Sequence, residues 1–288
     1  FTAIKGTSFS VKAGEIFGIL GPNGAGKTTT LEIIEGIKQQ TSGSVKVLGL
    51  DNLKNVLEIK QRIGVQLQSS EYIPELTLNE LLKLFAGLYG CEANVDELLG
   101  FVNLEGRKHS LVKELSGGQK QRFTLASSLV NNPEVLFLDE PSTGLDPRAR
   151  RDVWDLIRKI NSSGKTIILT THYMEEAEYL CDRVAIMDAG QILAINNPKT
   201  LIEDLSHTTQ ISFLTTDEVN EKIWKTIPEI DKVYSNYPKV VLEIKSLEVI
   251  GDVVNLLRKK KISFSSFTVR TASLEDVYLD LTGKVYEE

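Results

Sequence analysis

The chain has 288 residues, of which 41% are hydrophobic and 25% charged, a composition typical of a globular protein with one large and one small domain. Acidic residues outnumber basic ones, and the formal net charge of −6 argues against nucleic acid as a partner. Cys91 and Cys181 lie far apart, and no apolar run reaches the roughly 20 residues of a bilayer-spanning helix. We therefore expect a cytoplasmic protein that reaches a membrane only through a partner.

The amino-terminal segment predicts a strand, a glycine-rich turn and a helix. Strands are expected over Ile4–Val11 and Glu15–Leu20, and the second is continuously apolar, like the buried strands of parallel sheets. Apolar residues recur at helical spacing from Leu31 to Ile37, so a helix is expected to begin near Lys27. In this order of elements, the amino terminus of the helix can bind a phosphate group.

The middle of the chain predicts an α/β fold with a helical insertion. Apolar stripes predict helices from about Thr77 to Val130, and we place a helical subdomain at about 70–133. Strands are then expected at Val135–Leu138 and Thr166–Leu169, with a helix from about Arg148 to Asn161 between them. This alternation predicts a parallel sheet.

Beyond Pro198 the pattern changes to strand, helix, strand, strand, helix, strand, which is the order of a small α+β ferredoxin-like domain. The expected elements are the strands Ile211–Leu214, Lys232–Tyr234, Lys239–Ile244 and Phe264–Val269 and the helices Asp217–Thr226 and Leu247–Lys260. We therefore expect a nucleotide-binding domain at 1–205 and an accessory domain at 206–288.

A P-loop pattern lies between the strand that ends at Leu20 and the following helix. Its glycines allow backbone N–H groups to converge on an anion, Lys27 can neutralise the β and γ phosphates, and the Thr28 hydroxyl can be a ligand of Mg²⁺. We assign phosphate binding to this pattern and the threonine after it: Gly21, Pro22, Asn23, Gly24, Ala25, Gly26, Lys27, Thr28 and Thr29.

Two carboxylates follow the predicted strand Val135–Leu138, at the carboxyl end where ligands bind in open α/β sheets. Asp139 is suited to hold the magnesium ion. Glu140 can orient and deprotonate the water that attacks the γ phosphate. The alternative interpretation is that both residues are exposed acids of a surface loop. The P-loop earlier in the chain makes this alternative less favourable.

The segment Leu115–Arg122 resembles the signature sequence of ABC ATPases, which other P-loop NTPases lack. Physically, it is a second helix amino terminus suited to an anion. The resemblance covers roughly residues 1–205 and implies two copies packed head to tail around two ATP molecules. It also implies that the signature residues act on the ATP of the partner subunit: Ser116, Gly117, Gly118 and Gln119.

Further positions match the same family in order. Gln68 resembles the Q-loop glutamine, which implies contacts with Mg²⁺ and the attacking water and a link to the membrane partner. Thr143–Asp146 resembles the D-loop, so Asp146 is expected to cross the dimer interface, and His172 resembles the switch histidine that contacts the γ phosphate. The aromatic residue that usually stacks on adenine is expected upstream of Phe1.

The resemblance implies an ATP-hydrolysing subunit that uses ATP and Mg²⁺, pairs with a second copy and powers a separate membrane permease from the cytoplasmic face. Ser273–Gly283 looks like the closing helix of ATPases from bacterial multidrug, antibiotic and polysaccharide or lipid exporters, which favours export.

Two alternatives stay open at this point. The first is an importer ATPase whose carboxyl-terminal domain is regulatory. The second is a soluble ABC ATPase that acts on ribosomes or DNA. A single nucleotide domain disfavours the translation-factor branch. The P-loop and the signature are also too close in sequence to enclose the long coiled coil of the DNA-repair branch.

Overall fold

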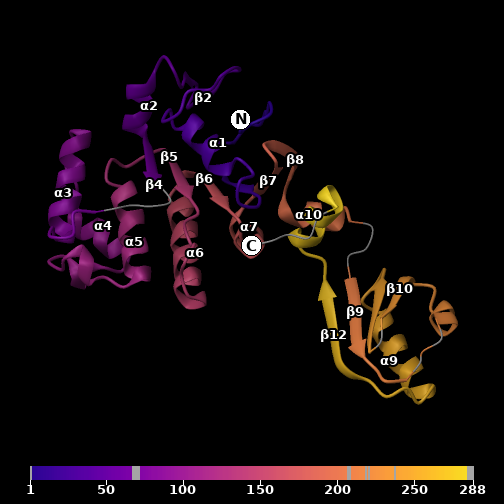
Figure 1. Cartoon of the computed structure of the whole chain (residues 1–288). Helices are drawn as coiled ribbons and strands as arrows, with labels where there is room; N and C mark the ends of the chain where they lie inside the picture. The colour runs from indigo at the N-terminus through magenta and orange to yellow at the C-terminus, as the bar shows by residue number, and fades with distance from the viewer. Residues whose placement is uncertain are drawn as a thin grey trace. The chain divides into compact units, whose positions relative to one another are not determined.

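The computed structural model describes residues 2–66, 72–205, 209–217, 219, 221–236 and 238–283 (Figure 1). The chain divides into two compact units, and the division falls between Pro198 and Lys199. We call the amino-terminal part unit 1 and the carboxyl-terminal part unit 2. The boundary predicted after residue 205 differs from this division by one short helix, α8 (Pro198–Glu203). Within the described residues, no helix combines the length and apolar character that a membrane span requires.

Unit 1 is built on a six-stranded sheet in the order β4-β5-β6-β1-β7-β8. All neighbouring strands are parallel except β7 and β8, which are antiparallel. The parallel sheet predicted from the sequence is therefore confirmed, and β7 and β8 extend it beyond the predicted strands. The strands are β1 (Ile16–Leu20), β4 (Ile63–Gln66), β5 (Val135–Asp139), β6 (Thr166–Thr171), β7 (Arg183–Asp188) and β8 (Gln191–Asn196).

The register of the sheet brings three loops to one edge. Leu20 at the end of β1 pairs with Thr171 at the end of β6, and Asp139 at the end of β5 pairs with Thr170. The chain therefore leaves β1, β5 and β6 at nearly the same level, because the strands are parallel and end together. The ends of these three strands and the loops after them carry the P-loop, the acidic pair Asp139 and Glu140, and His172.

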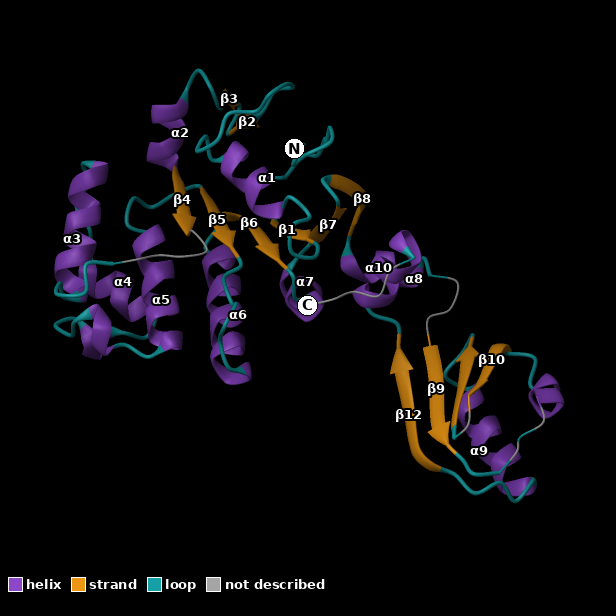
Figure 2. Cartoon of the chain, viewed as in Figure 1, coloured by secondary structure: helices purple, strands orange, loops and turns teal. Residues whose placement is uncertain are grey.

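Helices flank the sheet and form a separate group beside its β4 edge. Figure 2 shows α1 over one face, α6 and α7 on the opposite face, and α3, α4 and α5 gathered beyond β4. The larger helices are α1 (Lys27–Ile34), α3 (Leu78–Tyr89), α4 (Val95–Phe101), α5 (Gly117–Ser128), α6 (Pro147–Ser162) and α7 (Met174–Leu180). The smaller elements are β2 (Lys46–Val47), β3 (Leu50–Asp51), α2 (Val56–Arg62), and the 3₁₀ turns η1 (Glu105–Arg107) and η2 (Val112–Glu114).

One predicted strand of unit 1 is wrong, whereas the predicted start of its first helix is confirmed. The described residues of the predicted strand Ile4–Val11 form no strand. The Lys5 N–H donates to the Gly190 carbonyl at 2.7 Å, while apolar side chains of this segment pack onto the core. Their alternation therefore reflects burial rather than a hydrogen-bonded ladder. The helix α1 begins at Lys27 as predicted and ends at Ile34, so Ile37 lies outside it and is 50% exposed.

Unit 2 has a four-stranded antiparallel sheet in the order β10-β11-β9-β12. Strand β11 lies between β9 and β10, which gives the split arrangement of the ferredoxin-like fold predicted from the sequence. The elements are β9 (Thr209–Leu214), η3 (Glu221–Thr226), β10 (Ile230–Asn236), β11 (Lys239–Ile244), α9 (Val249–Lys259), β12 (Ser265–Thr271) and α10 (Leu274–Thr282).

One element of unit 2 differs from its prediction. The helix expected over Asp217–Thr226 is the short 3₁₀ turn η3, and the Asp217 carboxylate instead accepts a hydrogen bond from the Ser263 N–H at 2.7 Å. Trp224 of η3 nevertheless enters the core that α9 covers through Val253 and Leu257. Burial of Trp224 therefore accompanies a 3₁₀ segment rather than the predicted α-helix.

Because β4 packs closely against the end of α5, we expect a substitution at Gly64 to lower the stability of unit 1. A Cβ at Gly64 would lie 2.1 Å from the Ser128 carbonyl oxygen, so Gly64→Ala should destabilise unit 1 by about 3 kcal/mol through overpacking. Gly87→Ala is the matched control, because nothing lies within 4 Å of its Cβ position in α3, and it should stabilise by about 0.5 kcal/mol. Urea unfolding followed by Trp154 fluorescence in a Trp224→Phe background measures both, and equal midpoints would contradict the packing argument.

Candidate functional site

The P-loop is shaped by two glycines that no other residue could replace without movement. A Cβ at Gly21 would lie 2.2 Å from the Met187 carbonyl oxygen, and Gly26 has φ of 101°, in the left-handed region. Gly26 is also the N-cap of α1. The first N–H groups of α1 have no partner within the helix, so they are free to face an anion at this end.

Lys27 is the first residue of α1, and its ammonium group reaches back to the P-loop backbone. Its Nζ donates to the carbonyl oxygens of Gly21 at 2.8 Å and Pro22 at 3.2 Å, and it lies 3.4 Å from Glu140 Oε1. Only 4% of Lys27 is exposed. Burial lowers the pKa of Lys27, and the nearby carboxylates of Glu140 and Asp139 oppose that change. The P-loop is thereby joined to the acidic pair by one buried ion pair.

Glu140 occupies the centre of the site in a left-handed backbone conformation, with φ of 48°. Its N–H donates to the carbonyl and hydroxyl oxygens of Thr170, at 3.2 and 3.0 Å. The Thr143 hydroxyl donates to Oε2 at 3.2 Å, and His172 Nδ1 lies 3.3 Å from the same oxygen. Burial would raise the pKa of Glu140, but Lys27 and His172 hold it below its ordinary value. Glu140 is therefore a carboxylate at neutral pH.

Asp139 is held beside the P-loop by two hydroxyl groups. Thr28 Oγ1 donates to Asp139 Oδ1 at 3.3 Å, and the Thr170 hydroxyl donates to the same oxygen. Burial raises the pKa of Asp139, and these two hydrogen bonds oppose the change. Thr170 is a site residue that the sequence interpretation missed, although its place at the end of β6 is the signal that could have indicated it.

The residues beside Asp139 fit a magnesium ion. Mg²⁺ prefers oxygen ligands and takes only one or two of them from the protein beside a nucleotide. A carboxylate and a hydroxyl 3.3 Å apart at the mouth of the P-loop supply that donor set. Among the described residues, no cluster of three or more His, Cys, Asp or Glu side chains is present.

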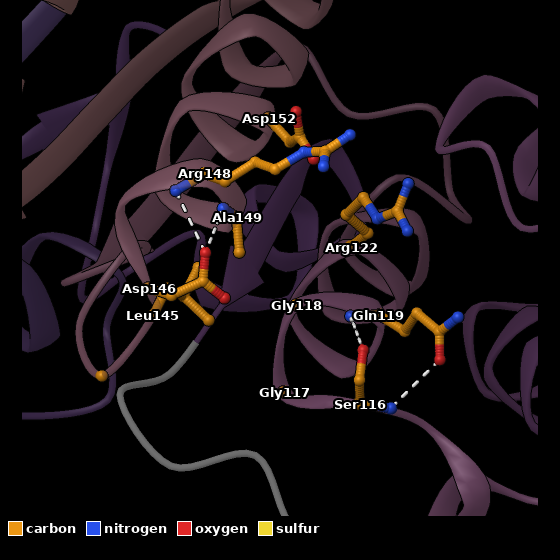
Figure 3. Close-up of a pocket in the computed structure, with 11 residues that line it drawn as sticks. Ser116, Gly117, Gly118, Gln119, Arg122, Leu145, Asp146, Arg148, Ala149 and Asp152 are labelled. Atoms are coloured by element: carbon orange, nitrogen blue, oxygen red, sulfur yellow. Dashed lines mark hydrogen bonds between the residues drawn. The ribbon is translucent and has the colours of Figure 1, made fainter.

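The signature segment and the D-loop of the same chain line one pocket of about 470 Å³. Figure 3 shows Ser116 and Gln119 on one side and Asp146 and Arg148 on the other. Ser116 is the N-cap of α5, accepting from the Gln119 N–H at 3.3 Å and donating its own N–H to Gln119 Oε1 at 3.0 Å. The lining residues are Ser116, Gly117, Gly118, Gln119, Arg122, Gly144, Leu145, Asp146, Arg148, Ala149 and Asp152, none of which belongs to the P-loop.

Asp146 has a defined structural role in this pocket. Its Oδ1 accepts hydrogen bonds from the N–H groups of Arg148 at 3.0 Å and Ala149 at 2.9 Å, so it caps α6. Its contact across a dimer interface stays a prediction. Gln68, predicted to contact Mg²⁺ and the attacking water, lies outside the described residues, as does Phe1.

Comparison with known proteins decides the family. A family model described as ABC transporter matches residues 4–143. Nod factor export ATP-binding protein I of Burkholderia orbicola (strain AU 1054) is 38% identical over 290 residues, covering 99% of this chain and 93% of that protein. Linearmycin resistance ATP-binding protein LnrL of Bacillus subtilis (strain 168) is 35% identical over 298 residues, covering 100% and 96%. The chain belongs to the ATP-binding proteins of ABC transporters.

Solved structures of this family agree with unit 1. The structure of the ATP binding subunit of an ABC transporter superposes with a TM-score of 0.62 at 28% identity, covering 70% of this chain and 86% of that chain. A dimeric ATP-binding cassette in a post-hydrolysis state, bound to ADP and Pi, gives 0.61 at 28%, covering 68% and 90%. As a member of this family, the chain binds and hydrolyses ATP.

Glu35, at the carboxyl end of α1, makes the stability of this ABC ATPase depend on pH. The residue is 3% exposed, and burial, with smaller contributions from Asp139 and Glu32, raises its pKa from 4.5 to about 7. A raised carboxyl pKa favours folding while the group is protonated. The contribution is complete below about pH 4.5 and is lost as the pH rises through about 7.

Glu35→Gln should therefore stabilise the protein more at pH 8 than at pH 5, by about 2 to 3 kcal/mol, because the amide cannot ionise. Urea unfolding at the two pH values measures the difference. The exposed Glu75→Gln serves as the control and should give no such difference. A Glu35→Gln effect that is equal at both pH values would contradict the raised pKa.

Proposed function

We propose that this chain is the ATP-hydrolysing subunit of an exporter-type ABC transporter. It works as one of two copies and drives a separate permease from the cytoplasmic face of the membrane. The observation that carries the proposal is the position of Glu140. It lies between Lys27 of the P-loop and His172 after β6, at 3.4 and 3.3 Å. These are the parts that a P-loop ATPase needs at one γ phosphate.

Hydrolysis follows from how these three side chains share charge. Lys27 is buried and partly neutralised by Glu140, so phosphates of ATP offer it a stronger anionic partner. As Lys27 turns to the phosphates, Glu140 loses its nearest cation, and its carboxylate becomes a better acceptor for a water proton. His172 remains beside Glu140 and can donate to the γ phosphate or hold the attacking water in line.

Thr28 and Asp139 are the residues that we propose would hold Mg²⁺, together with Gln68, whose role stays a prediction. When bound, the ion neutralises charge on the β and γ phosphates. The chain's contribution is orientation: Thr170 fixes the Asp139 carboxylate and, through the Glu140 N–H, the start of the next loop. One threonine thus sets the spacing between the metal-binding acid and the hydrolytic acid.

The signature residues support a pair of copies. Ser116, Gly117, Gly118 and Gln119 line a pocket that contains no P-loop residue, so their helix amino terminus is available to the ATP of a second subunit. Arg122 and Arg148 also line this pocket, together with Asp146 and Asp152. The dimeric cassettes among the similar structures support this arrangement. We propose a homodimer with two ATP molecules at its interface.

Two observations support export over import. Both named relatives span almost all of this chain, including unit 2, and their names refer to Nod factor export and to linearmycin resistance. The closing helix α10, capped by Ser273 and ended by Gly283, forms as the sequence predicts. An importer ATPase with a regulatory unit 2 is the alternative. A small molecule that binds unit 2 and inhibits hydrolysis would favour it.

Glu140→Gln should retain ATP binding and slow turnover by at least about a hundredfold, the usual scale for loss of a positioned base. The amide keeps the size of the side chain and its contact distance to Lys27 but cannot accept a water proton. Phosphate release measured under saturating Mg²⁺ and ATP gives turnover, and equilibrium binding of a fluorescent ATP analogue gives affinity. Near-normal turnover would remove Glu140 from the proposed role.

The same variant should trap the nucleotide-bound pair and retain the membrane partner. Affinity purification of Glu140→Gln from gently solubilised cells with Mg²⁺ and ATP is therefore expected to bring a polytopic membrane protein, identified by mass spectrometry. Glu140→Gln combined with Lys27→Ala is the control, because weaker phosphate binding should reduce the recovery. Recovery of ribosomes or DNA-bound factors instead would favour the soluble alternative.

A further inference from the structure

Helix α6 contacts the segment that carries His172 at two places along the helix. At the first, the Arg150 guanidinium carbon lies 4.0 Å from the centre of the Tyr173 ring. The Tyr173 ring also lies 4.1 Å from the His172 ring, at an interplanar angle of 44°. Tyr173 thus contacts a cation of α6 and the histidine that faces Glu140.

The second place lies one turn further along both helices. Trp154 of α6 donates its indole N–H to Glu176 Oε1 of α7 at 2.7 Å, and both side chains are fully buried. A buried carboxylate in such a contact holds its partner firmly, because separation would leave both polar groups unsatisfied. The first turns of α6 and the segment from His172 to Glu176 are therefore expected to move as one body.

We propose that Tyr173 is a positioning residue for His172, and that Arg150 makes this position depend on α6. The inference rests on the proposed function, in which Asp146 at the start of α6 faces the second copy and His172 faces the γ phosphate. Asp146 caps α6 through Arg148 and Ala149, directly before Arg150. Approach of the second copy to the D-loop is then transmitted to His172 by a few packed side chains.

The physical basis is the restriction of the histidine ring. His172 Nδ1 lies 3.3 Å from Glu140 Oε2, so a modest rotation of the ring would break this contact. The Tyr173 ring packs against the His172 ring at 4.1 Å, and the Arg150 cation over the tyrosine ring holds the tyrosine in place. The backbone helps, because the Tyr173 N–H donates to the Thr171 hydroxyl at 2.9 Å.

The test compares three tyrosine variants of the full chain by steady-state ATP hydrolysis. Tyr173→Ala should lower kcat by about 10- to 100-fold with KM for ATP changed less than about threefold, the scale of a misplaced catalytic group. Tyr173→Phe keeps the ring and should retain most of the kcat. Tyr179→Ala is the matched control. It removes another half-buried tyrosine that contacts α6 through Arg158, with 4.4 Å between the guanidinium carbon and the ring centre, and through Trp154.

A spectroscopic measurement separates positioning from loss of stability. The chain has three histidines, so selectively labelled His172 can be assigned with one His172→Gln spectrum. Its ring protons should be shifted upfield by the adjacent tyrosine in the parent chain and in Tyr173→Phe. The shift should be lost in Tyr173→Ala and retained in Tyr179→Ala.

Each outcome decides the question. A parent chain that hydrolyses ATP, with Tyr173→Ala equally active or no more impaired than Tyr179→Ala, would overturn the positioning role while leaving the proposed function intact. A parent chain without hydrolysis would instead fail the proposed function itself. Arg150→Met should lower kcat about threefold or more, the scale of one cation–π contact, and an unchanged kcat would overturn the link to α6.

Discussion

Lys27 and Glu140 are both almost completely buried, and their side chains lie 3.4 Å apart at the edge of the sheet where β1 and β5 end. Each charge needs the other, because an isolated buried charge costs several kcal/mol. The pair also determines the protonation of both groups, with the carboxylate favoured at Glu140. The rest of the site is arranged so that an anionic substrate can take the place of one member of this pair.

The parallel sheet is what makes the pair possible. Its register places the ends of β1, β5 and β6 side by side, and the loops there carry groups that are far apart in sequence. Thr170 of β6 bonds the carboxylate of Asp139 and the N–H of Glu140. The left-handed backbone at Glu140, with φ of 48°, turns the chain immediately after the strand. Strain of this kind persists where the surroundings hold the residue from several sides, as Thr170, Thr143 and Lys27 do here.

The second pocket has a different character from the first. Its groups are a helix amino terminus at Ser116, the D-loop with Asp146, and the cations Arg122 and Arg148. The pocket and the P-loop site are connected within the chain by α6, which begins at Asp146 and contacts the His172 segment through Arg150 and Trp154. In the proposed dimer, we propose that these packed and hydrogen-bonded pairs are the route by which the two nucleotide sites communicate.

From the sequence alone we predicted the parts whose chemistry depends on local order. The P-loop, the acids after an apolar strand and the signature helix are contiguous patterns, and the alternation of strands and helices predicted the parallel sheet. It did not predict Thr170 or Tyr173 as site residues, because their importance comes from Asp139 and Arg150, which are distant in sequence. Nor did it exclude the strand at Ile4–Val11, because burial against a core and pairing in a sheet give the same apolar alternation. These points could be established from the structure and not from the sequence, because they depend on which backbone groups and rings meet across the fold.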